Sequence, residues 1–163
     1  MAQFDKQQIK AMAANKTTKK QNGLGMLPEL VGFHIRLAQV AVFKNFADGL
    51  GELDITPTLF GVLVIIDSNP GLKQTELATA VQLDRSTVVS VIDKLERRDL
   101  VVRKRVAKDR RSNSLELTSA GRKLLKTIVP RVKEHEKQLC SNLSKEEQQT
   151  LLGLLSKVFP EYR

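Results

Sequence analysis

Hydrophobic residues recur at intervals of three and four over most of the chain, which predicts a mainly helical protein. The first such stretch begins at Leu27 and is expected to end near Gly49. A second begins at Thr56, a suitable N-cap followed by a first-turn proline, and ends in a turn at Asn69. Its sequence, TPTLFGVLVII, is almost entirely apolar, so we expect this helix at the centre of the core.

The middle of the chain predicts two more helices and a β-hairpin. A short helix is expected over about 74–80, followed by a tight connection to Asp84, whose carboxylate can cap a helix from Arg85 to about Arg98. At about 100° per residue, this helix has one apolar face, made of Val88, Val91, Ile92 and Leu95. The runs LVVRKRV and LEL then predict two strands, with the charged stretch VAKDRRSNS as the loop between them.

The C-terminal part predicts two helices. Thr118 is placed to cap a long helix that reaches about Cys140, and Pro130 is expected to kink or interrupt it. Ser144 and Glu147 have the spacing of a capping box for the last helix. The fold class is therefore mainly α with a small β-hairpin wing (α+β), a winged helix-turn-helix flanked by N- and C-terminal helices.

This order of elements divides the chain into four segments. We expect residues 1–22 to form a flexible or weakly helical basic arm, and 23–55 to contain the first long helix with its connector. Residues 56–118 are expected to form the DNA-binding lobe, and 119–163 to contain the C-terminal helices. In a winged helix-turn-helix the second helix enters the major groove and the hairpin tip reaches the minor groove.

Charge supports a DNA partner. The 163 residues carry a formal net charge of +9, which is expected of proteins that bind phosphate or anionic membranes. Residues 85–111 hold ten Lys and Arg and four Asp and Glu, so this short segment supplies +6 of that charge. A solvated charged face is the alternative for the charges alone. Their coincidence with the helix-turn-helix pattern favours double-stranded DNA.

Several classes of protein are not expected. No apolar run is long enough to span a membrane and the N-terminus lacks an apolar leader, so we expect a cytoplasmic protein without a membrane partner. Cys140 is the single cysteine, and His34 and His135 lack ligand spacing, so no metal or cofactor is expected. Nucleophile–base pairs and phosphate-binding glycine loops are missing from the sequence, so we expect no enzyme.

The stretch LDRSTVVSVIDKLERRDLVVRKRVAKDRRSNSLELTSAG resembles the signature region of the MarR family of transcriptional regulators. The matching features are the DRST helix start, the DKLE-x-x-x-LV helix exit, and the D-R-R wing followed by LELT-x-AG. The resemblance covers about residues 27–159. It implies a homodimer joined by the first and last helices and bound to a pseudo-palindromic operator. By this resemblance, 23–55 contain the first dimerisation helix and 119–163 the C-terminal dimerisation helices, which flank the winged helix-turn-helix.

The resemblance also implies roles for single residues. Arg111 is expected to enter the minor groove, and Asp109 to hold its guanidinium by a charge-assisted bond, beside a compatible role for Asp109 in forming the turn. Lys108 and Arg110 are expected to contact phosphates. The residues expected in or beside the major groove are Ser86, Thr87, Ser90 and Arg97, with Arg85 and Lys94 nearby.

Asp93 and Glu96 lie in the same segment, although their charges repel phosphate. We therefore interpret them as intramolecular partners of Arg97, Arg98 or Arg85.

The effector site is less strongly indicated. Members of the family commonly respond to small aromatic acids, and His34 and Arg36 could pair with a carboxylate or phosphate. Phe33, Leu37 and Phe60 could wall an aromatic pocket. The alternative for all five is an ordinary role in the core, the surface or the dimer interface. The stretches GFHIRLAQVAVFKNFADGL and ITPTLFGVLVIIDSNPGL are similar to repressors of hydroxycinnamate catabolism, which respond to phenolic acids or their CoA thioesters.

Two alternatives stay open from the sequence. An architectural DNA binder without sequence preference or ligand would fit the basic arm and the wing. A redox sensor is less favoured, because no cysteine lies near the start of the first helix and Cys140 fits a small half-buried thiol.

Overall fold

The computed structural model describes residues 23–106 and 109–159, and the side chains of 106–112 are outside this description. The described residues form two units, and the boundary between them falls inside helix α2, between Ala38 and Gln39. The basic arm expected over 1–22 lies outside the described residues. The first unit contains a 3-10 turn, η1 (Leu27–Glu29), and the beginning of α2 (Val31–Leu50).

One detail of the first predicted helix is wrong. Leu30 has an extended backbone (φ −95°, ψ 123°), so the turn that contains Pro28 is separate from α2. The predicted end of this helix near Gly49 is confirmed, because α2 ends at Leu50.

The second unit is built around α3 (Pro57–Ser68), as its apolar sequence predicts. Its N-cap is Thr56, whose hydroxyl accepts a hydrogen bond from the Leu59 amide at 3.2 Å. Four of its side chains are buried in the core: Leu59, Val62, Leu63 and Ile66. The last turns of α2 and the short helix η2 (Gly51–Leu53) lead into this core through the buried side chains Phe46, Leu50 and Ile55.

Helices α4 (Gln74–Val81) and α5 (Arg85–Arg97) follow the lengths that the sequence predicts. The tight connection between them is made by Gln82, which adopts a left-handed conformation (φ 51°). The predicted inner face of α5 is confirmed, since Val88, Ile92 and Leu95 are buried and Val91 is half-buried. The apolar pattern alone therefore fixes which side of α5 faces away from the protein.

The sheet is larger than the predicted hairpin. Strands β2 (Val101–Val106) and β3 (Asp109–Leu117) pair antiparallel, and a two-residue strand β1 (Leu72–Lys73) pairs with the other edge of β3. The expected loop VAKDRRSNS is wrong in its extent, because β3 already begins at Asp109. Backbone groups make the ladder, so polar side chains that face solvent do not prevent pairing.

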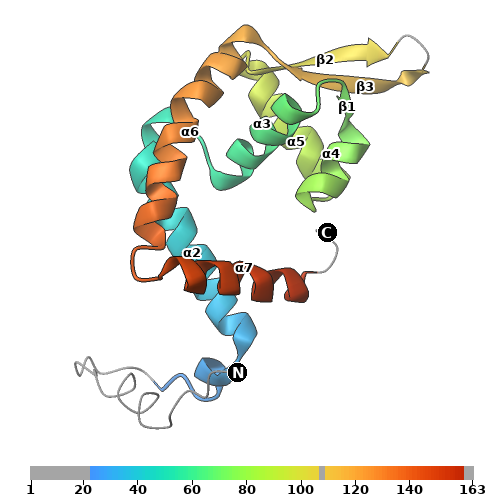
Figure 1. Cartoon of the computed structure of the whole chain (residues 1–163). Coiled ribbons are helices and arrows are strands. Elements are labelled where there is room, and N and C mark those ends of the chain that lie inside the picture. Colours follow the sequence, from blue (N-terminus) through green and yellow to red (C-terminus); the bar gives the residue numbers. More distant parts are fainter. Residues whose placement is uncertain (1–22, 107–108, 160–163) are drawn as a thin grey trace. The chain divides into compact units, whose positions relative to one another are not determined.

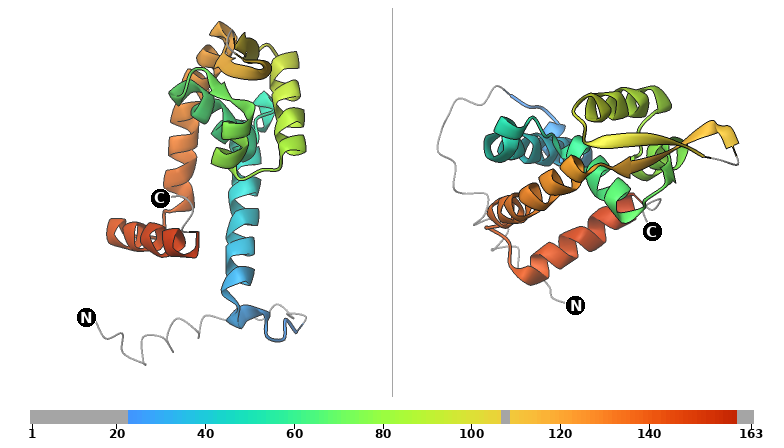
Figure 2. Two further views of the ribbon diagram at one scale, coloured as in Figure 1. Left: turned by 90° about the vertical axis from the view of Figure 1, so that its right-hand side faces the viewer. Right: turned by 90° about the horizontal axis from the view of Figure 1, so that it is seen from above.

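The C-terminal helices are α6 (Ser119–Leu139) and α7 (Lys145–Val158). Thr118 caps α6 by accepting a hydrogen bond from the Gly121 amide at 2.9 Å, and Ser144 and Glu147 form the expected capping box of α7. An interruption at Pro130 is not found, because α6 continues through it to Leu139. Within the second unit, Figures 1 and 2 show α6 starting at the base of the hairpin, and the hairpin extending beyond α4 and α5.

Candidate nucleic-acid interface

The start of α5 is fixed by Asp84. Its Oδ1 accepts a hydrogen bond from the Thr87 amide at 2.8 Å. Its carboxylate also accepts hydrogen bonds from the hydroxyl groups of Ser86 and Thr87. These bonds, from Ser86 first and then Thr87, hold the pKa of Asp84 well below its usual range. Asp84 is therefore a charged N-cap that locks the first turn of α5.

The three hydroxyl groups expected to face the major groove each donate a hydrogen bond within the protein. Ser86 and Thr87 donate to Asp84, and Ser90 Oγ donates to the Ser86 carbonyl at 3.1 Å. Ser86 and Ser90 are exposed, and Thr87 is half-buried. Each hydroxyl oxygen keeps lone pairs, so in this state it can accept a hydrogen bond from a base amino group such as adenine N6 or cytosine N4.

The cations of α5 differ in their surroundings. Arg85 and Arg97 are exposed and make no ion pair with another described residue. Lys94 is paired with Asp54 at 3.0 Å, and its hydrogen bond and charge lower the pKa of Asp54. Arg97 and Arg85 are therefore the cations of this helix that are available to an outside anion.

Arg98, directly after α5, fixes this end of the helix to the end of η2 and the residue that follows it. Its guanidinium donates to the carbonyl oxygens of Asp54 and Leu53 at 2.7 and 2.8 Å. Only about a quarter of its side chain is exposed (27%). This arginine has a positioning role rather than a free charge.

The two acidic residues of α5 are paired, but with a different arginine from those expected. Arg103 on β2 donates to Asp93 at 2.6 Å and to both oxygens of Glu96. The expectation that Arg97, Arg98 or Arg85 would be the partner is wrong, since β2 folds back alongside α5 and brings Arg103 between the two carboxylates. The pairing neutralises negative charge beside the surface that would meet phosphate.

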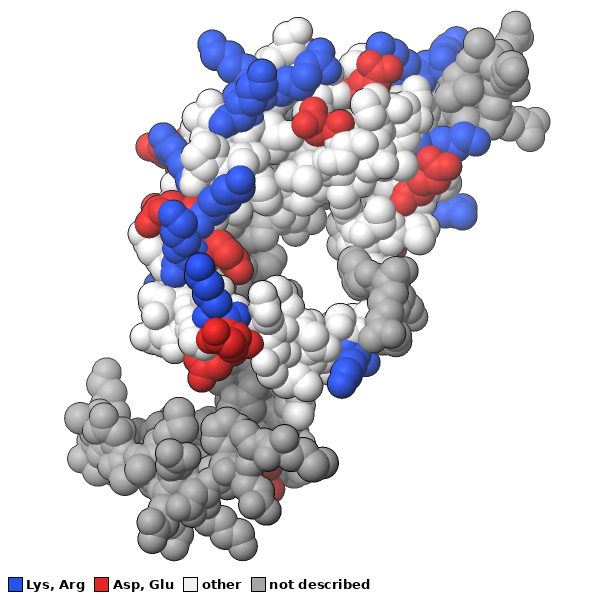
Figure 3. Space-filling model, in the orientation of Figure 1, with Lys and Arg blue, Asp and Glu red and all other residues white. Residues whose placement is uncertain are grey.

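The wing residues lie at the far end of the hairpin. Asp109, Arg110 and Arg111 are at the start of β3, where Val106 pairs with Asp109 and a register irregularity follows Arg105. Lys108 lies outside the described residues, and so do the side chains that would form the expected bond between Asp109 and Arg111. In the space-filling view, Lys and Arg gather on the end of the second unit that carries the hairpin and the start of α6 (Figure 3).

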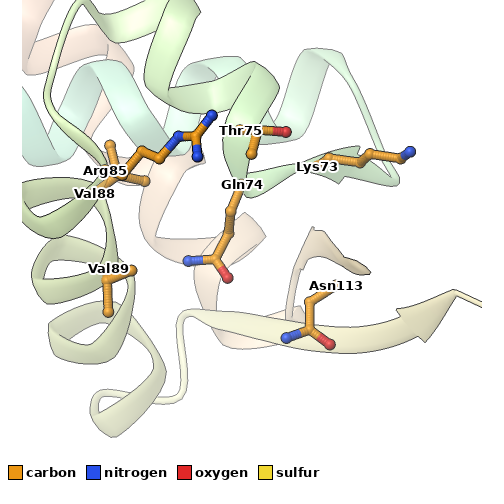
Figure 4. Close-up of a pocket in the computed structure, with 7 residues that line it drawn as sticks. All are labelled: Lys73, Gln74, Thr75, Arg85, Val88, Val89 and Asn113. Carbon is orange, nitrogen blue, oxygen red and sulfur yellow. The ribbon is translucent and has the colours of Figure 1, made fainter. Parts of the chain in front are cut away.

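A groove beside α5 contains residues that the sequence did not indicate. It has a volume of about 210 Å³ and lies between α4, α5 and β3 (Figure 4). Its lining residues are Lys73, Gln74, Thr75, Arg85, Val88, Val89 and Asn113. Four of these are new candidates, because strand β1 and the strand conformation of Asn113 were not foreseen: Lys73, Gln74, Thr75 and Asn113.

The candidate effector residues fall in both units, and each unit is described by itself. In the first unit, the rings of Phe33 and His34 meet edge to face at 5.8 Å, and His34 Nε2 lies 2.8 Å from the Pro28 carbonyl oxygen. Arg36 and Leu37 are exposed on the same helix.

In the second unit, Phe60 is half-buried and lies 6.1 Å from Phe46, whose ring also meets His135 at 5.7 Å. His135 helps to line a pocket of about 520 Å³ between the end of α2 and α6. Its Nε2 is buried without a hydrogen-bond partner among the described residues. The sequence offered no sign of this pocket, because its lining residues come from distant parts of the chain.

The described residues contain no cluster of His, Cys, Asp or Glu that could hold a metal ion. Within the same residues, no single helix has the length and apolar character to cross a membrane. One bent pair, Val31–Leu53 with Pro57–Ser68, reaches that threshold together on length and composition alone.

The helix-turn-helix of α4 and α5, followed by a basic hairpin, defines a winged helix-turn-helix DNA-binding protein. A model of the MarR family matches residues 55–112. The chain is also 38% identical over 136 residues to a protein of Thauera aromatica whose name assigns it to transcriptional regulation of the hcr operon, covering 83% of this chain and 82% of that protein.

Solved structures agree with this class. The transcriptional repressor CouR bound to a 23-mer DNA duplex has 37% identity and a TM-score of 0.80, over 85% of this chain and 98% of its own. CouR bound to p-coumaroyl-CoA has 34% identity and a TM-score of 0.79, over 85% and 97% of the two chains. The chain belongs to the MarR family, and it is a DNA-binding transcriptional regulator rather than an enzyme.

Proposed function

We propose that this protein is a ligand-responsive repressor. As a homodimer it binds a pseudo-palindromic operator, and a small aromatic acid or its CoA thioester releases it, which places it in the control of aromatic-compound (hydroxycinnamate) catabolism. Support comes from CouR, a repressor solved both with a DNA duplex and with p-coumaroyl-CoA, and from the Thauera aromatica relative named for an operon.

The observation that carries the DNA-binding part is the outer surface of α5. Short hydroxyl side chains allow the helix to come close to base edges, while Arg85 and Arg97 keep their charges for DNA. Arg103 neutralises Asp93 and Glu96 on the flank that faces the hairpin. The helix is thus presented to DNA as a cationic surface of fixed geometry.

Exposed apolar side chains on the end helices support the homodimer. Large hydrophobic residues that face solvent in a single chain mark an interaction surface. On α7 and directly after it these are Leu151, Leu152, Leu154, Val158 and Phe159. Around η1 and along α2 they are Leu24, Met26, Leu27, Leu30, Val31, Leu37, Val40 and Phe43.

We therefore assign 23–55 and 119–163 to dimerisation, 56–118 to DNA binding and 1–22 to a basic arm.

For the effector we propose contacts in each unit taken by itself: Phe33, His34, Arg36 and Leu37 on the part of α2 in the first unit, and Phe60 on α3 in the second. The unliganded dimer holds its two recognition helices about 34 Å apart, one turn of DNA. An effector that binds a differently spaced dimer more tightly lowers DNA affinity by that difference in binding free energy.

The test is fluorescence anisotropy with DNA that flanks this protein's own gene, against scrambled DNA, over a salt series. The additions are p-coumarate, ferulate and their CoA thioesters. Preferential binding that one of these reverses is the expected result. Equal binding to both DNAs, steep in salt and indifferent to every addition, would instead identify an architectural binder, because phosphate contacts carry little sequence information.

The wing is tested by Arg111→Ala. Loss of a groove-inserted arginine is expected to weaken operator binding by roughly 1–3 kcal/mol while effector binding persists. Lys133→Ala is the matched control, since it removes one positive charge from α6, outside the surface formed by α5 and the hairpin. An Arg111→Ala loss no larger than that of the control would remove the wing from the proposed interface.

A further inference from the structure

Val89 is a large apolar residue exposed on α5. It is 46% exposed, and among the described residues from Lys44 to Thr150 it is the only large hydrophobic side chain that is exposed. The other exposed apolar side chains belong to the end helices, where a second copy of the chain can cover them. Val89 lies on α5, the helix proposed to enter the major groove, so its exposed apolar surface is available to DNA rather than to a second copy of the chain.

The surroundings of Val89 contain a second unsatisfied group. Val89 follows Arg85 by one helical turn, and both line the groove between α4, α5 and β3. In Figure 4 the Gln74 side chain reaches from α4 into the space between Val89 and Asn113. Its Nε2 is shielded from water and has no hydrogen-bond partner among the described residues.

An apolar surface beside a hydrogen-bond donor matches one base edge. In the major groove thymine presents a C5 methyl group and the O4 acceptor. Cytosine lacks the methyl and presents an amino donor in place of O4, so it satisfies neither group.

We infer that this groove reads a thymine, with Val89 against the C5 methyl and Gln74 donating to O4. The contact uses the amide turned by a half-turn about χ3, a torsion that is broad and roughly two-fold. This turn moves Nε2 into the groove and places Oε1 in the shielded position. Arg85, at the rim, is placed to contact a neighbouring phosphate. The inference rests on the proposed function, because it takes α5 to lie in the major groove of an operator.

The first experiment removes only the methyl. A duplex selected by the purified wild-type protein from a random-sequence library is resynthesised with single thymines replaced by deoxyuridine, and binding is measured by anisotropy. Burial of one methyl group is worth about 0.8 kcal/mol, so one position per half-site should lose roughly four-fold in affinity, and both together roughly fifteen-fold. Val89→Ala should bind thymine and uracil duplexes alike at that position, while the salt slope stays that of wild type because phosphate contacts are retained.

The second experiment changes the hydrogen bond and keeps the methyl. At the same position, 5-methylcytosine paired with guanine replaces the O4 acceptor with an amino donor. Wild type should prefer thymine, and Gln74→Glu should shift its preference toward 5-methylcytosine, because a carboxylate accepts from that amino group. Since the ratio of two affinities is compared within one variant, an overall loss from the added negative charge does not affect the result.

The outcomes separate this inference from the proposed function. If wild type prefers the selected duplex over scrambled DNA and no thymine shows a Val89-dependent methyl effect, the thymine assignment is overturned and the repressor proposal stands. An unchanged preference in Gln74→Glu removes the hydrogen bond to O4. A wild-type protein without any sequence preference overturns both proposals.

Discussion

Gly121, near the start of α6, has no room for a side chain. A Cβ built on it would lie 2.0 Å from the Leu100 carbonyl oxygen, where real Cβ contacts are not shorter than 3.0 Å, so at least about 1 Å of movement is required. The obstacle is backbone, and the same oxygen accepts a hydrogen bond from the Thr118 amide at 3.1 Å. The end of α5 and the start of α6 therefore depend on a glycine at this contact.

Gly121→Ala should destabilise the protein by about 2 kcal/mol. Overpacking costs typically 1–3 kcal/mol, and a rigid backbone obstacle places this site near the top of that range. Replacing a helical glycine by alanine returns roughly 0.5–1 kcal/mol. For a chain of this size the net loss corresponds to a fall in Tm of about 4–8 °C.

Thermal denaturation followed by circular dichroism measures this fall. Gly61→Ala in α3 is the matched control, because no atom lies within 4 Å of the added Cβ and the helix propensity gain is expected without a clash. An increase in Tm for both variants would show that the approach of Gly121 to Leu100 does not restrict the fold.

Three further predictions follow from single contacts. Arg103→Met should weaken operator binding at low salt, because Asp93 and Glu96 are left unpaired beside phosphate. Salt screens that repulsion, so the loss of affinity should shrink as salt is added in an anisotropy series. Unchanged affinity at low salt would refute this role. The pKa of Asp84 is lower in the folded protein than in the unfolded chain, so its stabilising effect is present above about pH 4 and is lost as the pH falls further. Wild type should therefore exceed Asp84→Asn in Tm at neutral pH, and the difference should narrow progressively as the pH falls below about 4. A constant difference would contradict the linkage. Burial, followed by the nearby Glu136 carboxylate, raises the pKa of the Cys140 thiol, so this thiol is a poor nucleophile. Cys140→Ser should therefore keep the full effector response in the anisotropy assay. Loss of the response would favour a redox sensor.

The ion pairs on the two flanks of α5 give the recognition helix a fixed orientation. On one flank Arg103 joins it to the hairpin, and on the other Lys94 and Arg98 join it to the segment around Asp54. These surface pairs contribute little to stability one by one, since exposed pairs are typically worth about 0–1 kcal/mol. Their position matters more, because a movement of either flank would change how α5 meets DNA in the proposed complex.

Most of the secondary structure could be predicted from the sequence, because helix signals are local. A cap acts on amides two or three residues away, so Thr56, Asp84, Thr118 and Ser144 each marked the start of a helix that the structure contains. The inner face of α5 followed from its apolar spacing for the same reason. The MarR family could likewise be recognised from consecutive residues alone, in the stretch from Leu83 to Gly121.

Tertiary structure alone decided the contacts between residues that are far apart in the chain. No local pattern could indicate that β1 would pair with β3, that Arg103 would reach Asp93 and Glu96, or that Gln74 would lie beside Val89. A two-residue strand has too few positions to show an alternating pattern, and any of several cations could have served two acids equally well. Such contacts arise when packing of the apolar core sets the distance between elements, and that distance is a property of the whole fold rather than of any segment.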